Sequence, residues 1–166
     1  MTLNESTVEP ICQRVRLIKL EFNGTAATSP TSGRPKTISR EVKSSIGAQL
    51  TVDGFHAKLA ITYELGINAA EQTSLAEITL EHELQYLRAF DFEPPTSEEL
   101  RTIFIDGQET VHALVRERVL SLTAALGIRP VVLPSLPRRE VASIVDSYSI
   151  EVEDSAGEGG SDGSAT

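Results

Sequence analysis

Four side chains in this chain are of types that bind metals or act as nucleophiles: Cys12, His56, His82 and His112. They lie far apart in the sequence, and no grouping of Cys, His, Asp or Glu has a spacing typical of a metal site. No glycine-rich phosphate loop follows any predicted strand. The sequence therefore predicts neither a metal nor a nucleotide, and we expect no cofactor.

The tripeptide Glu81-His82-Glu83 combines two carboxylates with an imidazole, the groups used in general acid–base catalysis. On a strand, however, successive side chains point to opposite faces, so His82 points away from both carboxylates and is expected to be a half-buried core residue. Cys12 has no motif around it and is expected to pack as a small apolar side chain. No serine stands in a Gly-x-Ser-x-Gly elbow. We therefore expect a protein that is not an enzyme.

Alternating apolar and polar residues predict a β-hairpin in the first half of the chain. Residues 41–53 have apolar side chains mainly on even positions, and residues 55–67 have them on odd positions. Asp53-Gly54 between them suits a two-residue type I′ turn, which would place Val52 opposite Phe55. Both apolar sets then fall on one face of the sheet.

Two further strands are predicted on either side of this hairpin. Residues 74–90 alternate in the same way, and residues 12–22 are apolar first on odd and then on even positions. This change of parity, between Leu17 and Ile18, is explained by one extra residue at a β-bulge. Residues 23–40 are rich in Ser, Thr, Gly and Pro and too long for a hairpin loop. The first strand is therefore expected to cross over to another place in the sheet.

Helices are predicted after the strands. The spacing of Thr96-Ser-Glu-Glu99 is that of a capping box, so a helix begins there. Gly107 is expected to interrupt this helix before the main helix, which ends near Gly127. Residues 137–150 predict a short amphipathic helix. This order predicts an α+β domain, in which a four-stranded antiparallel sheet with a crossover loop after the first strand packs against C-terminal helices.

Length and composition indicate one domain and exclude some partners. The 166 residues, 40% of them hydrophobic, suffice for a single domain over residues 11–150, preceded by a flexible N-terminus at 1–10. Residues 151–166 contain acids and no base, and we expect them to form a disordered acidic tail. The net charge of −9 disfavours nucleic acids and anionic membrane surfaces. With one cysteine, no secretory signal and no run of about 20 apolar residues, a cytoplasmic protein without membrane insertion is expected.

The main helix carries two apolar strips. At about 100° per residue, one broad arc holds most of the apolar side chains, with Arg118 inside it. The members of this arc are Val111, Leu114, Val115, Val119, Leu122, Ala125 and Leu126. A narrower strip of Ala113, Leu120 and Ala124 lies on the other side. Although a single exposed leucine is ordinary, the two strips predict a helix packed between its own sheet and another subunit. The expected oligomer interface is Ala113, Arg118, Leu120 and Ala124, with Arg118 paired at its border.

The residues around this helix resemble the SecB and SecB-like chaperones. The family pattern is Phe/Tyr-Pro-Tyr-x-Arg-Glu, a helix, and then Gly-x-Pro-Pro-x-x-Leu-x-Pro. The matching stretches here are Val111-His-Ala-Leu-Val-Arg116-Glu117, Gly127-Ile-Arg-Pro130 and Val132-Leu-Pro134. Gln13-Arg14-Val15 and Phe22 are similar to the family's first strand. Several weak matches in the same order, covering residues 12 to about 136, carry the resemblance.

The resemblance implies a homotetramer, a dimer of dimers with long helices between two sheets. It also implies ATP-independent holding of unfolded polypeptides in apolar grooves near the crossover loop, the second strand and the helix. Such a groove, with exposed strand edges, meets both the apolar side chains and the unpaired backbone of a non-native chain. The client-binding candidates are Phe22, Ile46, Leu50, Ile103, Phe104 and Leu120. Each of them can instead be a plain core residue.

Two departures from the family pattern bear on partners. Where the export chaperone has two first-strand acids that help dock the SecA translocase motor, this chain has Lys19 and Asn23, so docking of SecA through that surface is doubtful. Ala113-Leu114 replaces the Pro-Tyr before Arg-Glu. Clients in protein export, an antitoxin of a toxin–antitoxin system, or general holdase activity remain open. The alternatives are an oligomeric, non-catalytic α+β protein that binds one small ligand or one fixed protein partner, and a degenerate enzyme.

Overall fold

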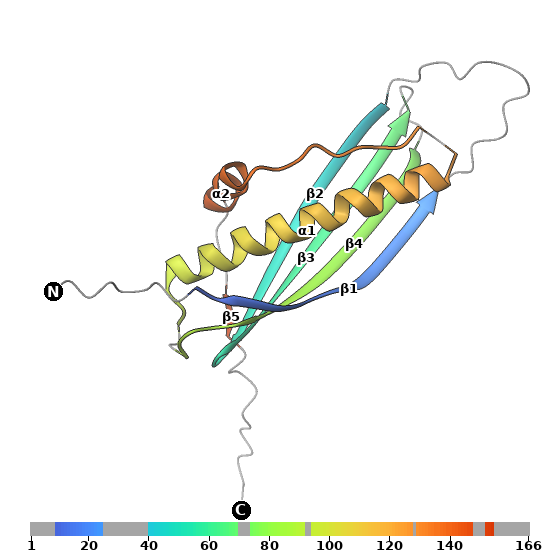
Figure 1. Cartoon of the computed structure of the whole chain (residues 1–166). Coiled ribbons are helices and arrows are strands. Elements are labelled where there is room, and N and C mark those ends of the chain that lie inside the picture. The colour runs from blue at the N-terminus through green and yellow to red at the C-terminus, as the bar shows by residue number, and fades with distance from the viewer. Residues whose placement is uncertain are drawn as a thin grey trace, which may run out of the picture.

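A single sheet, built on four long antiparallel strands, carries two helices on one side (Figure 1). The structure, a computed structural model, describes residues 9–24, 40–69, 74–91, 94–127, 129–147 and 152–154. Its elements are β1 (Ile11–Gly24), β2 (Arg40–Asp53), β3 (His56–Ala69), β4 (Ser74–Leu87), α1 (Ser97–Ala125), α2 (Arg138–Ser147) and β5 (Val152–Asp154). The strand order is β1-β4-β3-β2-β5. The predicted α+β class, with four long antiparallel strands followed by helices, is confirmed.

The first strand does cross over, as predicted. β1 pairs with β4 at one side of the sheet, whereas β2 lies at the other side of the β3–β4 pair. β1 also contains the predicted bulge, because its register with β4 shifts between Leu17 and Lys19 and leaves Ile18 as the extra residue. A second shift, between Cys12 and Arg14, was not predicted. The bulge keeps Val15 and Leu20 on the face that α1 covers, opposite Leu84 and Leu80.

The predicted register of the β2–β3 hairpin is wrong. The turn residues are Gly54 and Phe55, so that Val52 faces Ala57 and not Phe55. Gly54 supplies the positive φ of 56° that such a turn needs at its first central position. Both registers put the same residues on the same face, so the alternating pattern could not distinguish between them.

Arg88, just after β4, accounts for the turn that is found. Its backbone N–H donates to the carbonyl of Phe55 at 2.7 Å, and its Nη1 donates to the carbonyl of Gly54 at 2.6 Å. Nε and Nη2 donate to the two carboxylate oxygens of Glu99 at 2.6 and 3.1 Å. Glu99 therefore binds Arg88, while the N-cap Thr96 accepts from the Glu99 backbone as predicted. β4 ends at Leu87, earlier than the predicted Phe90, because the chain turns here to place Arg88.

One face of the sheet forms the core. Its side chains come from even positions of β2 and β4 and odd positions of β3, and α1 lies across them over β3 and β4. The fully buried members with the largest side chains are Leu50, Leu59, Ile61, Tyr63, Ile67, Ile78, Leu80, Leu84, Tyr86, Ile103, Val111 and Val115. The other face carries polar residues and lacks a helix in the described part of the chain.

α1 runs without interruption through Gly107, contrary to the sequence prediction. A Cβ atom at this position would overlap Leu59 Cδ2 and lie 3.3 Å from the hydroxyl of Tyr86. Glycine is therefore required for close approach of the helix to the sheet, and it does not end the helix. The helix ends at the C-cap Leu126, followed by Gly127 with φ of 72°, as predicted.

The chain after α1 returns along it and ends in α2 (Figure 1). Val131 and Leu133 of this returning segment, residues 129–137, are buried in the core cluster. α2 packs Val141 and Val145 against Ile105, which confirms the short predicted helix. Two ion pairs, Arg101–Asp146 at 2.7 Å and Arg138–Glu109 at 2.9 Å, also join α2 to α1.

The three-residue strand β5 was not predicted and lies inside the segment expected to be disordered. It pairs in parallel with β2, with Leu50 facing Val152. The rest of the tail and residues 1–8 lie outside the described residues, so the expectations for them stay predictions.

Replacing Gly107 by alanine tests the close packing of α1. Alanine favours a helix by about 1 kcal/mol over glycine, but overpacking a core costs about 1–3 kcal/mol. We expect Gly107→Ala to lower the free energy of unfolding by about 1 kcal/mol in chemical denaturation, since crowding exceeds the gain in propensity. Gly66→Ala is the control, because a Cβ there meets nothing within 4 Å. A more stable Gly107→Ala variant would contradict the packing argument.

Candidate functional site

One helix leaves part of the sheet uncovered. An α-helix with its side chains is about 10–12 Å wide, whereas the outer two of four strands lie about 14 Å apart, axis to axis. The returning segment covers the sheet on one side of α1. On the other side β1 approaches α1 at their C-terminal ends, where a Cβ on Gly24 would lie 2.6 Å from Leu126 Cδ2. Along the rest of β1 apolar side chains stay exposed.

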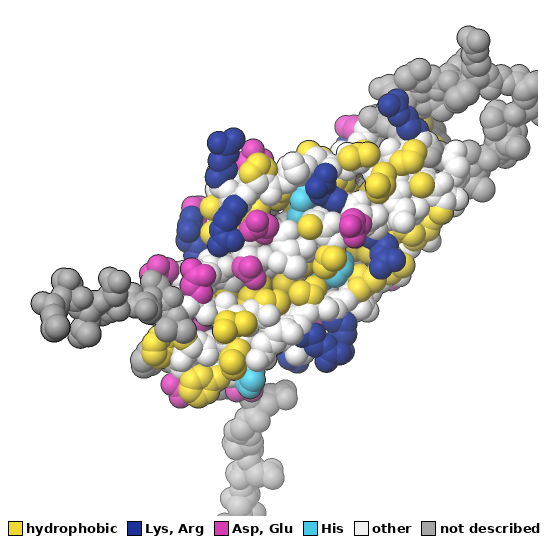
Figure 2. All heavy atoms as spheres, in the orientation of Figure 1, with side chains coloured by type: hydrophobic (Ala, Val, Ile, Leu, Met, Phe, Trp, Pro, Cys, Tyr) yellow, Lys and Arg dark blue, Asp and Glu magenta, His cyan; other side chains and the backbone are white. Residues whose placement is uncertain are grey.

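Exposed apolar side chains lie on both β1 and α1. We call Val15, Ile18 and Leu20 of β1 with Leu114 and Leu120 of α1 the β1–α1 surface; the exposed fractions of these five side chains range from 37% to 44%. Figure 2 shows hydrophobic side chains gathered along α1 and between α1 and β1. Large contiguous apolar surfaces on a folded protein are commonly sites of contact with proteins, membranes or ligands.

Arg118 lies on the same flank of α1. It is exposed and has no ion-pair partner among the described residues, so the predicted pairing at a subunit border is not present within one chain. It lies close enough to His82 for its charge to lower the pKa of that histidine. Arg118 is thus a free cation at the edge of an apolar surface.

His82 lies beneath this surface, between Leu17 of β1 and Ile61 of β3. The side chain is 5% exposed, and its Nδ1 atom has no hydrogen-bond partner within the described ranges. Burial and the charge of Arg118 lower its pKa from 6.5. Because His82 faces α1 while Glu81 and Glu83 face the other side of the sheet, the three cannot act as a catalytic group.

On the opposite flank, polar side chains of α1 hold the returning segment. Arg116 Nε donates to the Leu133 carbonyl at 2.9 Å, and the backbone N–H of Val131 donates to Thr123 Oγ1 at 2.9 Å. Arg116 belongs to the Arg-Glu pair of the sequence motif, and Leu133 belongs to the Leu-x-Pro part. The two halves of that motif are therefore joined by a hydrogen bond.

His112 joins this segment to the sheet. Its Nε2 lies 2.9 Å from the Pro134 carbonyl, which can only accept, so Nε2 carries the proton. Its Nδ1 lies 3.2 Å from the Tyr63 hydroxyl, which accepts a hydrogen bond from Gln108 Nε2. These contacts satisfy the buried Gln108 and show a structural histidine.

The remaining nucleophile is also structural. Burial raises the pKa of the Cys12 thiol, which makes it a poor nucleophile at neutral pH. Burial and a 2.7 Å hydrogen bond to Asp106 also raise the pKa of Tyr86 far above its usual range. No group of three or more Cys, His, Asp or Glu within the described ranges could hold a metal ion. None of the helices described is long and apolar enough to cross a bilayer.

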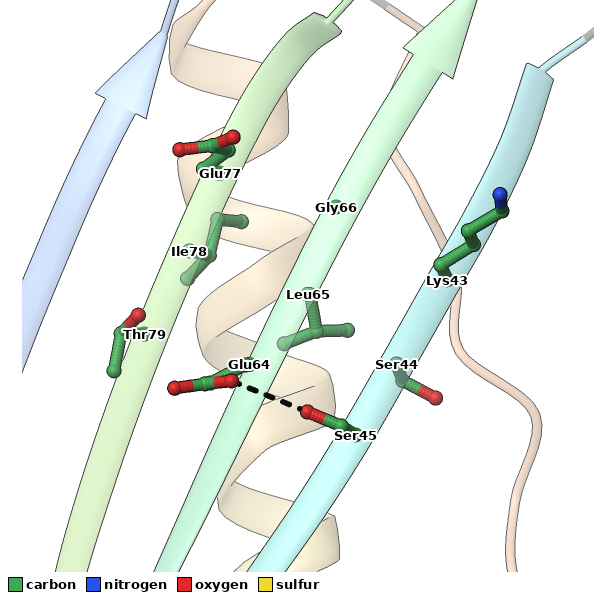
Figure 3. Close-up of a pocket in the computed structure, with 9 residues that line it drawn as sticks. All are labelled: Lys43, Ser44, Ser45, Glu64, Leu65, Gly66, Glu77, Ile78 and Thr79. Atoms are coloured by element: carbon green, nitrogen blue, oxygen red, sulfur yellow. Dashed lines mark hydrogen bonds between the residues drawn. The ribbon is translucent and has the colours of Figure 1, made fainter.

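A shallow hollow of about 460 Å³ opens on the polar face of the sheet (Figure 3). It lies where Gly66 has no side chain, between Lys43 and Glu77, which flank Gly66 in its row of the sheet. Glu64 accepts a hydrogen bond from Ser45 at 3.3 Å beside it. Charged, solvated walls differ from the apolar lining typical of small-molecule sites, so this hollow lends no support to a small ligand.

The structure separates the predicted client-binding residues. Leu120 is 41% exposed, and Phe22, Ile46 and Phe104 are half-buried at the edges of the core. Leu50 and Ile103 are fully buried, and a client could contact them only if the segments covering them moved. Their role in client binding stays a prediction.

The predicted interface residues Ala113, Arg118, Leu120 and Ala124 are all exposed. Leu114, expected to face the sheet, is 39% exposed instead. The buried side of α1 is centred on Val111, Val115 and Val119 and extends toward Thr123, because the returning segment covers that flank. Polar core residues such as Thr123 and Gln108 were missed, since an apolar pattern cannot mark them.

Comparison with solved structures shows the class of fold to which this geometry belongs. The chain superposes on the SecB-like chaperone Rv1957 of Mycobacterium tuberculosis, solved in complex with a ChAD peptide from the Rv1956 HigA1 antitoxin, with a TM-score of 0.63 and 19% identity over 78% of this chain and 91% of that one. The fold is therefore SecB-like. A protein of unknown function from Streptococcus agalactiae is similar with a TM-score of 0.42 and 13% identity, over 76% of this chain and 97% of that one. No family model and no curated protein matches the chain.

Lowering the pH tests the burial of His82. Because its pKa is lowered in the folded chain, the unfolded chain takes up a proton there first as the pH falls below about 6.5. The free energy of unfolding is therefore expected to decrease through that range. The free energy of unfolding of His82→Leu, measured by chemical denaturation between pH 8 and pH 5, should lack the contribution to this decrease that comes from protonation of His82. His56→Gln is the control, since His56 is exposed; the same flattening in that variant would contradict the assignment.

Proposed function

We infer that this protein is an ATP-independent, SecB-like holdase that binds non-native polypeptides and acts as a homo-oligomer, a tetramer built as a dimer of dimers, in the cytoplasm. One observation supports this most: on a SecB-like fold, apolar side chains stay exposed on β1, β2 and α1. Exposed apolar side chains on several neighbouring elements favour a protein that contacts other polypeptides.

The β1–α1 surface is the part we assign to a second copy. Leu120, with the small residues Ala113 and Ala124, lies on the side of α1 turned away from its own sheet, where small side chains let another helix approach closely. Arg118 at the border then finds its acceptor in the partner copy. This assignment explains a free cation beside apolar residues.

The apolar residues at the β2 side are the part we assign to clients. Val42 is 39% exposed on β2, and Ile46 of the same strand and Phe104 of α1 are half-buried against the core cluster. Apolar side chains together with the backbone of an edge strand can bind an extended polypeptide without reading its sequence. The antitoxin peptide on the Rv1957 chaperone supports a polypeptide as client, and an antitoxin, an exported protein or a general unfolded protein all fit. A translocase motor is a doubtful partner, since Lys19 pairs with Glu21 at 3.3 Å on the surface in question.

Aggregation assays test the holdase. Two unrelated proteins diluted from denaturant should scatter less light in the presence of this chain, with and without ATP. Val42→Ser with Ile46→Ser should raise the amount of chaperone needed by several-fold, because each exposed apolar contact contributes about 1 kcal/mol or more. Ile11→Ser is the control, since Ile11 is 62% exposed on β1, at the other side of the sheet from β2. Saturable binding of one compound, with no effect on scattering, would favour the small-ligand alternative.

Leu120→Asp tests the assembly. A carboxylate in the proposed contact between copies should reduce the molar mass measured by light scattering in solution, because burying an unpaired charge is costly. The strands should stay folded, as judged by circular dichroism, since Leu120 does not face its own sheet. Ser143→Asp, at an exposed position of α2 outside the β1–α1 surface, is the matched control. An unchanged molar mass for Leu120→Asp would contradict the proposed interface.

A further inference from the structure

The outer edge of β2 already holds an extended segment, which is the chain's own β5. Val152, Glu153 and Asp154 pair in parallel with Leu50, Thr51 and Val52. Edge strands present unpaired N–H and C=O groups that extended polypeptides can bind by strand addition. β5 thus shows that this edge accepts a strand, and which direction that strand takes.

The length and direction of β5 make its pairing with β2 weak. Three residues form a very short ladder, and parallel pairs are slightly less stable per residue than antiparallel ones. A strand of this kind is easily displaced.

The tether compensates for this weakness. β5 begins five residues after α2 ends at Ser147, so the pairing is intramolecular. Short tethers give effective concentrations on the order of millimolar, which keeps a weak strand in place until a competitor with more contacts arrives.

A competitor has more of the edge available than β5 uses. From Glu41 to Ala48 the outer edge of β2 pairs with no strand in the described part of the chain. Val42 and Ile46 lie along this stretch, on the helix side of the sheet, opposite Ile67 and Tyr63. A longer extended segment gains backbone hydrogen bonds and apolar contacts that β5 lacks.

We propose that the outer edge of β2 is a strand-addition site for an extended client polypeptide, and that β5 occupies its hairpin end as an internal competitor. The proposal rests on the proposed function and specifies how a client is bound. The client forms a strand parallel to β2, held mainly by backbone hydrogen bonds and in addition by side-chain contacts. Affinity for clients is then set partly by the chain's own C-terminal segment.

The test replaces β5 residues by proline in the full-length chain. The variant is Val152→Pro with Glu153→Pro. Of two consecutive residues in a strand, one directs its N–H group toward β2, and proline has no N–H group, so the double substitution removes one hydrogen-bond donor from the β2–β5 pairing. Ser161→Pro with Asp162→Pro is the matched control, since it makes the same kind of change and removes one acid further along the tail. The probe is a small disulfide protein, reduced, alkylated with iodoacetamide and fluorescently labelled, and its binding is measured by anisotropy.

We expect the β5 variant to bind the probe about three- to tenfold more tightly than the natural chain, and the control to bind as the natural chain does. Hydrogen exchange at residues 50–52 should be faster in the β5 variant without probe, and slower again with probe. A chain ending at residue 150 should behave as the β5 variant does. A synthetic peptide of residues 149–158 should compete with the probe for that shortened chain.

The outcomes separate this inference from the proposed function. Suppression of aggregation by the natural chain, with equal probe affinity in all variants or no protection of residues 50–52 by the probe, overturns strand addition at β2 and leaves the holdase standing. Probe binding that appears only when β5 is disrupted supports the inference. It would show that β5 fully blocks the outer edge of β2 in the natural chain. No probe binding and no suppression of aggregation by any variant overturns both.

Discussion

The width of an α-helix determines how much of the sheet is covered in this molecule and how much stays exposed. One helix, even one of 29 residues, covers about two strands of a four-stranded sheet. α1 lies over β3 and β4, and Gly107 lets it approach until Leu59 and Tyr86 touch its backbone. The outer strands β1 and β2 are left to other parts of the chain or to other molecules. Exposure at both flanks follows from this geometry and needs no special property of either strand.

The chain covers the β2 side and the β1 side of α1 to different extents. On the β2 side, His112, Arg116 and Thr123 hold the returning segment by hydrogen bonds that use its backbone, so the cover there is tied to the helix. On the β1 side, apolar side chains and Arg118 have no cover in the described residues. A single chain thus covers part of its β2 flank with its own backbone and leaves the β1 flank uncovered within the described residues.

The crossover of the first strand, the bulge at Ile18 and both ends of α1 could be predicted from the sequence, because they follow from local patterns and from residues with strong preferences such as Thr96 and Gly127. The hairpin register could not, since two registers place the same residues on the same face and the choice depends on Arg88, distant in sequence. Gly107 was misjudged for a similar reason: a glycine that ends a helix and one that lets a helix approach a sheet look alike until the sheet is present. For the candidate site, the exposed Leu120 strip was visible as a pattern, whereas burial of Leu50 and Ile103 depends on which segments cover them.

Arg88 has a further consequence for how the chain reaches this structure. Its guanidinium is fully buried and is neutralised only when the hairpin turn, the end of β4 and the first turn of α1 are all in place. A partly folded chain that lacks any one of these leaves a charge in an apolar environment without its partners, at a cost of about 3–5 kcal/mol. Arg88 therefore couples the formation of the sheet to the docking of the helix and makes folding of this domain more nearly all-or-none.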